Sequence, residues 1–337
     1  MKVNVCLIGK GLVGTSLLQL LLEKKEFLKQ KFNLDLIVNS ILEKDGALIN
    51  PSGIDLKEVI DANENFRNLP YWENKVSLLP SISRLDINIC VETTPTNPNT
   101  GEPGLTHITQ ALNSHIDVVS SNKGPFYLEY EKIMKLAAEN KCFIKFEATV
   151  ASCVPALKIK EVLVGNEILR IKAILNGTSN FILSRMTSEG IKFSLALKEA
   201  QELGYAETDP TLDIEGYDAA GKLVILANEL LGWSKKISDV RVEGISKVTS
   251  HAIELADTDG FVIKHLAIAE NDELIVEPRL IDKHSSLNIS GNLNAVELET
   301  KYAGPLLIMG RGAGGFEAAS AILNDMIDIS IKRGYSI

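Results

Sequence analysis

Gly9-Lys10-Gly11-Leu12-Val13-Gly14 lies between the apolar run Val3–Ile8 and a helical pattern. A glycine pattern in this strand, turn and helix context predicts a dinucleotide-binding site, whereas elsewhere it indicates only a turn. Gly9 permits the tight turn, Gly11 lets the backbone approach a pyrophosphate, and Gly14 allows close packing of the helix. The N-terminus of that helix favours anionic phosphates.

The first 150 residues continue the same alternation of strands and helices. This alternation predicts a doubly wound α/β unit of Rossmann type with a parallel sheet. The expected strands are Val3–Ile8, Leu34–Val38, Ile87–Glu92, Asp117–Ser120 and Cys142–Glu147. The expected helices are Leu12–Lys25, Thr106–Ser114 and Leu128–Asn140.

From Val154 onward the pattern changes to that of a separate α+β domain. The expected helices are Pro155–Val164, Asn180–Ser188, Ser194–Leu203 and Tyr217–Leu231, and the expected strands are Ile168–Leu175, Phe261–Ala269 and Leu274–Ile281. A last amphipathic helix, Gly314–Lys332, follows a glycine-rich turn, which indicates that the chain returns to the first domain. We therefore expect a dinucleotide-binding domain from residues 1–150 and 306–337, and a substrate-binding, catalytic and dimerisation domain from residues 151–305.

The composition is that of a globular protein long enough for two domains, with 337 residues, 45% of them hydrophobic and 23% charged. A formal net charge of −9 without a dense basic cluster argues against nucleic-acid binding. No apolar run is long enough to cross a bilayer, and the chain enters a strand pattern at once, so we expect a cytoplasmic protein with no membrane partner.

The histidines are scattered singly, which disfavours a zinc site. The cysteines show no Cys-x-x-Cys pair and are interpreted as reduced core residues; they are Cys6, Cys90, Cys142 and Cys153.

The residues around the expected cofactor site leave the choice between NAD and NADP open. The second strand is expected to end at Val38-Asn39-Ser40, without the acidic residue that usually binds a ribose 2′-hydroxyl. No arginine follows to bind a 2′-phosphate, and Lys44 is the only cation nearby. Thr93 and Thr94 follow a strand at the carboxyl edge of the sheet, where a cofactor should lie, although a Thr/Pro turn also caps strands. Lys123, in a turn after the next strand, is expected to point toward the same crevice.

The densest polar cluster runs from Gly204 to Lys222 and carries five carboxylates, in the loop before a helix and in the first turn of that helix. Asp218 and Lys222 are four residues apart and share one face of that helix. Such a pair by itself is usually a solvated salt bridge. Together with the other acids it supplies what an ammonium-bearing substrate with a reacting hydroxyl needs, namely counter-charges and a proton-transfer group.

The pattern of this segment is Ala200-x-x-x-Gly204-Tyr205-Ala206-x-x-Asp209-Pro210-x-x-Asp213-Ile214-x-Gly216-x-Asp218-x-x-x-Lys222. Other segments that agree in order and spacing with the same family are Gly9–Gly14, Ser121-Asn122-Lys123-Gly124-Pro125, Glu147-Ala148-Thr149-Val150, Asn176-Gly177-Thr178-Ser179-Asn180 and Gly310-Arg311-Gly312-Ala313-Gly314-Gly315. On these motifs nearly the whole chain resembles homoserine dehydrogenases. The resemblance implies an NAD(P)-dependent interconversion of L-homoserine and L-aspartate 4-semialdehyde, in the aspartate-derived pathway to threonine, methionine and isoleucine.

The resemblance also implies roles for individual residues. Lys222 is the expected acid/base, and Lys123 assists near substrate and nicotinamide. The residues expected to bind the amino acid are Glu207, Asp213, Asp218, Gly177, Thr178 and Tyr205. The residues expected to contact the cofactor are Gly9, Gly11, Leu12, Val13, Gly14, Thr93, Thr94, Lys123 and Gly314.

Three further expectations follow from the resemblance. A monovalent cation such as Na⁺ is expected at the Glu147 carboxylate and at the carbonyls of Val150, Ser152 and Val154. In this sequence Ala151-Ser152-Cys153 replaces the glycine-rich turn that is usual in the family. The sequence ends soon after Gly314–Lys332, which matches the short form without a C-terminal regulatory domain, so feedback through such a domain is not expected. A homodimer is expected through strands around Phe261–Ile281 and Ala295–Thr300.

Two other functions compete with this interpretation. In an acylating semialdehyde dehydrogenase Cys153 would attack an aldehyde, which requires a nearby base. A redox-sensing binding module would keep the glycine loop but would need neither the two lysines nor the carboxylate cluster.

Overall fold

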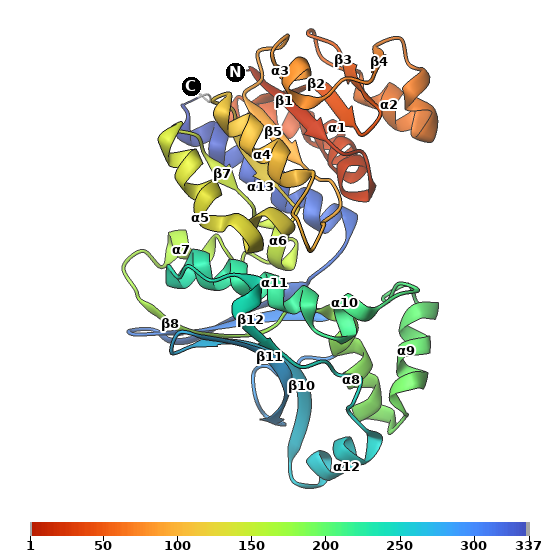
Figure 1. The fold of residues 1–337 in the computed structure, drawn as a ribbon, viewed down its shortest axis with the longest axis vertical. Coiled ribbons are helices and arrows are strands. Elements are labelled where there is room, and N and C mark those ends of the chain that lie inside the picture. The colour runs from red at the N-terminus through yellow and green to blue at the C-terminus, as the bar shows by residue number, and fades with distance from the viewer. Residues whose placement is uncertain (1, 335–337) are drawn as a thin grey trace. The chain divides into compact units, whose positions relative to one another are not determined.

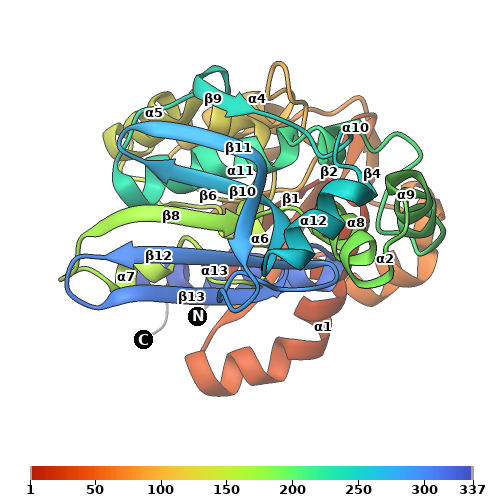
Figure 2. The same cartoon turned by 90° about the horizontal axis from the view of Figure 1, so that it is seen from below.

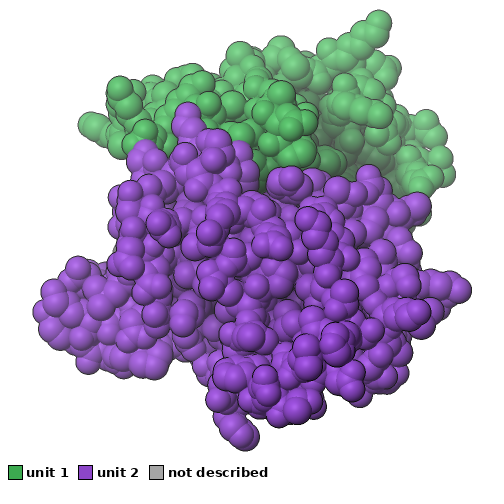
Figure 3. Space-filling view, turned by 60° about the horizontal axis from the view of Figure 1, so that its bottom comes forward, with its two compact units in different colours: residues 1–149, 314–337 green, residues 150–313 purple. Residues whose placement is uncertain are grey.

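The computed structural model describes residues 2–334, and the chain divides into two compact units. Unit 1 comprises the described residues up to Thr149 together with those from Gly314 onward, and unit 2 comprises Val150–Ala313 (Figure 3). No helix in the described part of the chain is long and apolar enough to cross a membrane.

Unit 1 contains a seven-stranded sheet in the order β4-β3-β2-β1-β5-β6-β7. Five neighbouring strands, β2, β1, β5, β6 and β7, are parallel. β3 and β4 extend the sheet beyond β2 with antiparallel pairing. This arrangement confirms the predicted Rossmann-type architecture. The strands are β1 (Lys2–Ile8), β2 (Asp35–Glu43), β3 (Gly46–Ile49), β4 (Trp72–Asn74), β5 (Ile89–Glu92), β6 (Asp117–Ser120) and β7 (Ile144–Lys145).

The first and last helices of the chain pack side by side on one face of this sheet (Figure 1). Their core includes Val3, Val5 and Leu7 of β1, which alternate along the strand and so point to the same face. α4 packs against β5 and β6 and covers the other face. The helices of unit 1 are α1 (Leu12–Phe32), α2 (Leu56–Ala62), the 3₁₀ helix η1 (Asn63–Asn68), α3 (Leu78–Ile82), α4 (Gly104–Asn113), α5 (Gly124–Glu139) and α13 (Gly315–Lys332), and α6 (Ala148–Ala151) crosses the division between the units.

The second strand differs from the sequence-based expectation, since β2 runs to Glu43 rather than ending at Ser40. Its register against β1 shifts between Val5↔Val38 and Cys6↔Ser40, as a β-bulge would cause. The extra residue breaks the alternation of side chains that marks a strand in sequence, and for this reason the strand appeared to stop early.

Unit 2 contains a six-stranded sheet in the order β13-β12-β8-β10-β11-β9, and Figure 2 shows the strands in this order. α8, α11 and α12 pack against its central strands. The strands are β8 (Ile168–Ile174), β9 (Val240–Val242), β10 (Phe261–Glu270), β11 (Glu273–Asp282), β12 (Leu293–Thr300) and β13 (Gly304–Arg311). The helices are α7 (Ile159–Val162), α8 (Gly177–Glu189), α9 (Phe193–Glu202), α10 (Thr211–Ile214), α11 (Tyr217–Leu226), α12 (Ser250–Thr258), the π-helical turn η2 (Ala227–Leu231) and the 3₁₀ helix η3 (Ile237–Asp239).

Two features of unit 2 differ from the prediction. The helix expected over Pro155–Val164 is only the single turn α7, because Val162 and Val164 are exposed and bury no apolar face that would stabilise a longer helix. Residues 306–313, expected in the dinucleotide-binding domain, lie in unit 2, because β13 pairs along its whole length with β12.

Candidate active site

The glycine loop of unit 1 has the shape that a dinucleotide requires. Gly9 has φ +94°, in the left-handed region. A Cβ on Gly14 would lie 2.1 Å from the carbonyl oxygen of Gly9, so only glycine lets α1 approach the loop this closely. A Cβ on Gly11 would meet nothing within 4 Å, which leaves open space at the start of α1. No side chain caps α1 and its first turn, with Leu12 and Val13, carries no acid, so this N-terminus fits a pyrophosphate.

The loop after β5 is hydrogen-bonded to the glycine loop and to a buried carboxylate. The Thr93 hydroxyl donates to the carbonyl of Gly9 at 2.7 Å. Glu92, 1% exposed, accepts the N–H of Thr94 at 2.7 Å and also the Thr94 hydroxyl. Its other oxygen lies 2.7 Å from Nδ1 of His107 on α4. These bonds hold Thr93 and Thr94 at the carboxyl edge of the sheet.

The turn after β6 joins the same edge. Asn122 donates from Nδ2 to the Thr94 hydroxyl at 3.2 Å, and the Lys123 N–H donates to the Thr96 hydroxyl at 3.3 Å. Lys123 is half-buried at the start of α5. The backbone of Lys123 therefore contacts the loop that follows β5.

The start of α13 lies beside the start of α1. A Cβ on Gly315 would lie 2.9 Å from Cγ of Leu12 and 2.5 Å from Oγ of Ser16. Gly314 has φ +136°, a conformation that favours glycine. Gly315, about 300 residues away in the chain, thus lies against the first turns of α1, and Gly314 directly precedes it.

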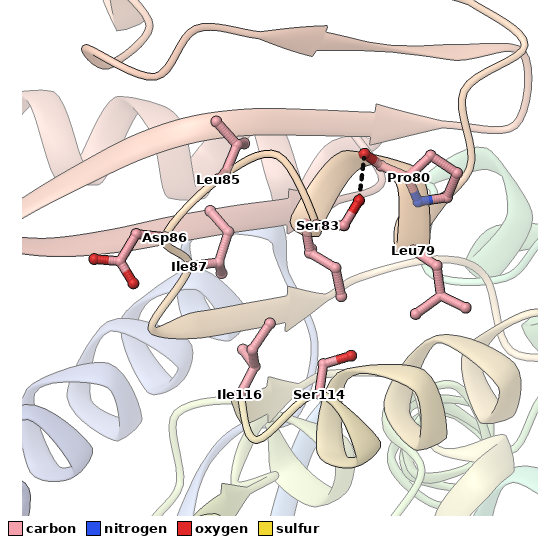
Figure 4. A pocket seen from close by; sticks show the side chains of 9 residues that line it. Leu79, Pro80, Ser83, Leu85, Asp86, Ile87, Ser114 and Ile116 are labelled. Carbon is pink, nitrogen blue, oxygen red and sulfur yellow. Dashed lines mark hydrogen bonds between the residues drawn. The ribbon is translucent and has the colours of Figure 1, made fainter.

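A hollow of about 630 Å³ lies at the opposite edge of the same sheet (Figure 4). Its lining includes Ile87, just before β5, and Ile116, just before β6. Cofactors bind at the carboxyl ends of parallel strands, so this hollow is not the predicted cofactor site.

Lys222 is the centre of the polar cluster in unit 2. It lies on α11, is 7% exposed, and sits among apolar residues that are also buried. Its Nζ lies 2.6 Å from Oδ2 of Asp218 and donates to the carbonyl of Leu175 at 2.7 Å. A buried ammonium needs such a counter-charge and such acceptors. The Asp218–Lys222 pair is therefore a buried pair rather than a solvated surface bridge.

Asn176 joins the two acids of the cluster, and the sequence interpretation gave it no role. Its Nδ2 donates to Asp213 at 2.6 Å and to Asp218 at 3.0 Å. Its Oδ1 accepts the N–H of Ser179 at 2.8 Å and so caps α8. An asparagine before a helix suggests only a cap, and no local pattern indicated two acids 37 and 42 residues away.

The environment of Asp213 raises the pKa of its carboxyl above the ordinary value. Burial raises the pKa of this carboxyl, and the neighbouring charge of Asp218 raises it further, while the hydrogen bond from Asn176 opposes the rise. A cationic group placed beside the pair would stabilise both charges. The cluster is thus suited to bind an ammonium group.

The other predicted substrate residues differ in their contacts and in their exposure. The Thr178 hydroxyl donates to the carbonyl of Tyr205 at 2.8 Å, which joins the start of α8 to the acid-rich loop. A Cβ on Gly177 would lie 2.7 Å from the carbonyl oxygen of Asn292, so the close approach there requires glycine. The Glu207 side chain is exposed.

The expected cation ligands divide between the units, with Glu147 in unit 1 and Val150, Ser152 and Val154 in unit 2. Within unit 1 the Glu147 N–H donates to Asp325 at 3.0 Å. Within unit 2 Ser152 has φ +52°, and its hydroxyl donates to the carbonyl of Gly312 at 3.1 Å. Among the described residues, no group of three His, Cys, Asp or Glu side chains could hold a metal ion.

The cysteines are only partly core residues. Cys6 and Cys90 are buried, Cys142 is half-buried, and Cys153 is exposed, which corrects the interpretation of all four as core. Cys153 follows the left-handed Ser152 at the end of α6, where the backbone turns. Within residues 2–334, no hydrogen bond joins Cys153 to a histidine.

Comparisons with known proteins show which family the chain is similar to. A family model described as homoserine dehydrogenase matches residues 155–327. A homoserine dehydrogenase of Methanocaldococcus jannaschii is 42% identical over 330 residues, which cover 97% of this chain and 98% of that protein. An NAD(+)-dependent homoserine dehydrogenase of Pseudomonas canavaninivorans is 34% identical over 344 residues, 97% and 96% of the two chains.

The fold is also that of solved relatives. The structure of a hyperthermophilic archaeal homoserine dehydrogenase in complex with NADPH matches with a TM-score of 0.84 and 30% identity over 98% of both chains. Identity above 30% over nearly full length, together with the family model, establishes the relationship. The chain belongs to the homoserine dehydrogenase family.

Proposed function

We propose that Lys222 exchanges the proton of the substrate hydroxyl and that the carboxylates around it bind the substrate ammonium. As a member of its family, the chain is an NAD(P)-dependent oxidoreductase that interconverts L-homoserine and L-aspartate 4-semialdehyde in the biosynthesis of aspartate-derived amino acids. The observation that carries the residue assignment is the buried Lys222 ammonium, held by Asp218 at 2.6 Å and by the Leu175 carbonyl at 2.7 Å.

The roles follow from the balance of charges. Reduction of the aldehyde adds a hydride from the nicotinamide to the carbonyl carbon and a proton to the oxygen. Lys222, whose Nζ lies 2.6 Å from Asp218, donates that proton, and in the oxidation it takes the proton back. Asp213 and Asp218 compensate the substrate ammonium, and Asn176 holds their carboxylates together.

The other proposed substrate residues are Gly177, Thr178, Tyr205 and Glu207. Thr178 and Gly177 belong to the helix start that Asn176 caps. Glu207 follows Tyr205 in the loop that Thr178 anchors, and its exposed carboxylate adds negative charge for a cationic substrate.

We also propose which residues hold the nicotinamide cofactor, whose hydride chemistry the protein supports by binding and orientation. They are Gly9, Gly11, Leu12, Val13, Gly14, Thr93, Thr94, Lys123 and Gly314. The open space at Gly11, the uncapped start of α1 and the bonds that fix Thr93 support this assignment. Lys123 assists the same site from the turn before α5.

A monovalent cation, Na⁺, is proposed at Glu147, Val150, Ser152 and Val154. One carboxylate together with carbonyl oxygens is a ligand set that a hard cation prefers. Turnover should rise with added NaCl and not with tetramethylammonium chloride at equal ionic strength, and Glu147→Gln should remove the difference. Equal rates in both salts would exclude this site from the reaction.

A homodimer is proposed through strands of unit 2, within Phe261–Ile281 and Ala295–Thr300. β10, β11 and β12 are the strands concerned, and Leu280 on β11 is 59% exposed. Light scattering after size-exclusion chromatography should give twice the chain mass, and Leu280→Glu should lower it. A monomeric wild type would refute the proposal.

The decisive test follows the absorbance of the reduced nicotinamide with L-homoserine and either NAD or NADP. Lys222→Ala should lose about 10²- to 10⁴-fold in kcat while the affinity for cofactor stays unchanged. Lys198→Ala is the matched control, because Lys198 lies in the same unit and its side chain is 72% exposed. Wild type inactive with both cofactors would contradict the reaction, and an unimpaired Lys222→Ala would contradict the role of Lys222 alone.

A further inference from the structure

The extension of β2 places an acidic residue beside the glycine loop. Because of the register shift, Ile8 of β1 pairs with Leu42, and the Gly9 N–H donates to the Leu42 carbonyl at 2.9 Å. Glu43 is therefore the last residue of β2, directly at the turn that begins the cofactor site. The position is the one at which dinucleotide-binding folds carry the acid for the adenosine ribose.

The Glu43 carboxylate is fixed toward this loop. Its Oε1 accepts the backbone N–H of Lys10 at 2.5 Å, and the side chain is 19% exposed. Its Oε2 lies 3.6 Å from the guanidinium of Arg67 on η1. One oxygen is thus held by the glycine loop, and the carboxylate keeps further acceptor capacity for a hydroxyl.

Two of the cations near Glu43, Arg67 and Lys10, already have hydrogen-bond partners. Arg67 donates to Asp45 through two nitrogens, at 2.9 and 3.3 Å, and its guanidinium lies over the ring of Phe66. The Lys10 ammonium donates to the carbonyl of Asn63 at 3.1 Å. A 2′-phosphate here would have to displace Asp45 from Arg67 while it approached the Glu43 carboxylate.

We propose that Glu43 accepts the 2′-hydroxyl of the adenosine ribose and makes this chain prefer NAD over NADP. The inference rests on the NAD(P)-dependent reaction of the family and adds the choice of cofactor. Family membership does not make this choice, because one relative is named NAD(+)-dependent and another was solved with NADPH. The contribution of Glu43 is a hydrogen bond to a neutral ribose and a like-charge repulsion against a phosphate.

The test compares wild type, Glu43→Gln and Glu58→Gln. Glu43→Gln keeps an oxygen for the Lys10 N–H and removes the charge, and Glu58 is an exposed acid of α2 in the same unit. For each protein, kcat/KM is measured with NAD and NADP, and the affinities for NADH and NADPH are measured by cofactor fluorescence without substrate. Wild type and Glu58→Gln should favour the NAD forms by about tenfold or more, and Glu43→Gln should lower this ratio by about tenfold.

The outcomes separate the inference from the reaction. Tighter binding of NADH than NADPH that depends on Glu43 supports the inference even if homoserine is not turned over, in which case only the reaction fails. Turnover of homoserine with equal or better use of NADP overturns the inference and leaves the reaction intact. A ratio unchanged in Glu43→Gln also overturns it.

Discussion

Asn176→Asp should weaken unit 2 and slow the reaction while leaving the helix cap in place. The aspartate keeps an oxygen for the Ser179 N–H, but it cannot donate to Asp213 or Asp218. Two hydrogen bonds to charged groups, at 2.6 and 3.0 Å, are lost. Each such bond contributes about 1.5–3 kcal/mol, and because both come from one amide group we expect a combined loss of about 3 kcal/mol.

The loss of stability in Asn176→Asp should grow as the pH rises. Burial and the charge of Asp218 already raise the pKa of Asp213, and a third carboxylate raises it further. Between the ordinary carboxyl pKa and the raised one, the folded protein binds more protons than the unfolded chain, so stability falls as pH rises. The deficit of the variant should therefore be smallest near pH 4 and largest at neutral pH.

The assay is urea unfolding followed by tryptophan fluorescence in a Trp72→Phe background, in which Trp233 of unit 2 is the remaining tryptophan. Ser179→Ala is the control, because it keeps the capped backbone N–H and removes only a hydroxyl that donates to the Asn176 carbonyl at 3.2 Å. A deficit of less than about 0.5 kcal/mol at pH 7, within the range of ordinary surface substitutions, would refute the reasoning. So would a deficit that is the same at pH 4 and pH 7.

Three further substitutions test other parts of the structure. Gly14→Ala puts a methyl group 2.1 Å from the Gly9 carbonyl oxygen and should cost about 2–3 kcal/mol of stability and most of the cofactor affinity; unchanged NADH fluorescence titration would contradict the close approach. Glu92→Gln weakens the acceptor of the Thr94 N–H and hydroxyl, so the KM for the cofactor should rise about tenfold with the KM for homoserine nearly constant, and a rise in both KM values would argue for general damage. Burial lowers the pKa of Lys264 from 10.5 to about 8, so the unfolded chain binds the extra proton between these pH values. Wild-type stability relative to Lys264→Met should accordingly rise by up to about 3 kcal/mol from pH 8 to 10.5, and a flat difference in denaturation free energy would show that the ammonium is not desolvated.

The sequence alone determined the parts of the site that lie close together in the chain. The glycine loop is a local strand, turn and helix unit, so its residues and their purposes could be inferred without tertiary information. Asp218 and Lys222 share a helical face because they are four residues apart, and the structure places them 2.6 Å apart. The alternation of strands and helices likewise predicted the Rossmann-type sheet, because each element buries one face with its own period.

Tertiary structure decided which distant residues complete each site. Asn176, at the start of α8, bridges Asp213 of α10 and Asp218 of α11, and neither its type nor its spacing indicated this. Glu43 reaches the glycine loop only because a bulge lengthens β2, and Arg67 reaches Glu43 from η1. β13 belongs to unit 2 through its pairing with β12. Side-chain patterns encode burial within one element, whereas pairing register and long-range contacts depend on how the elements pack together.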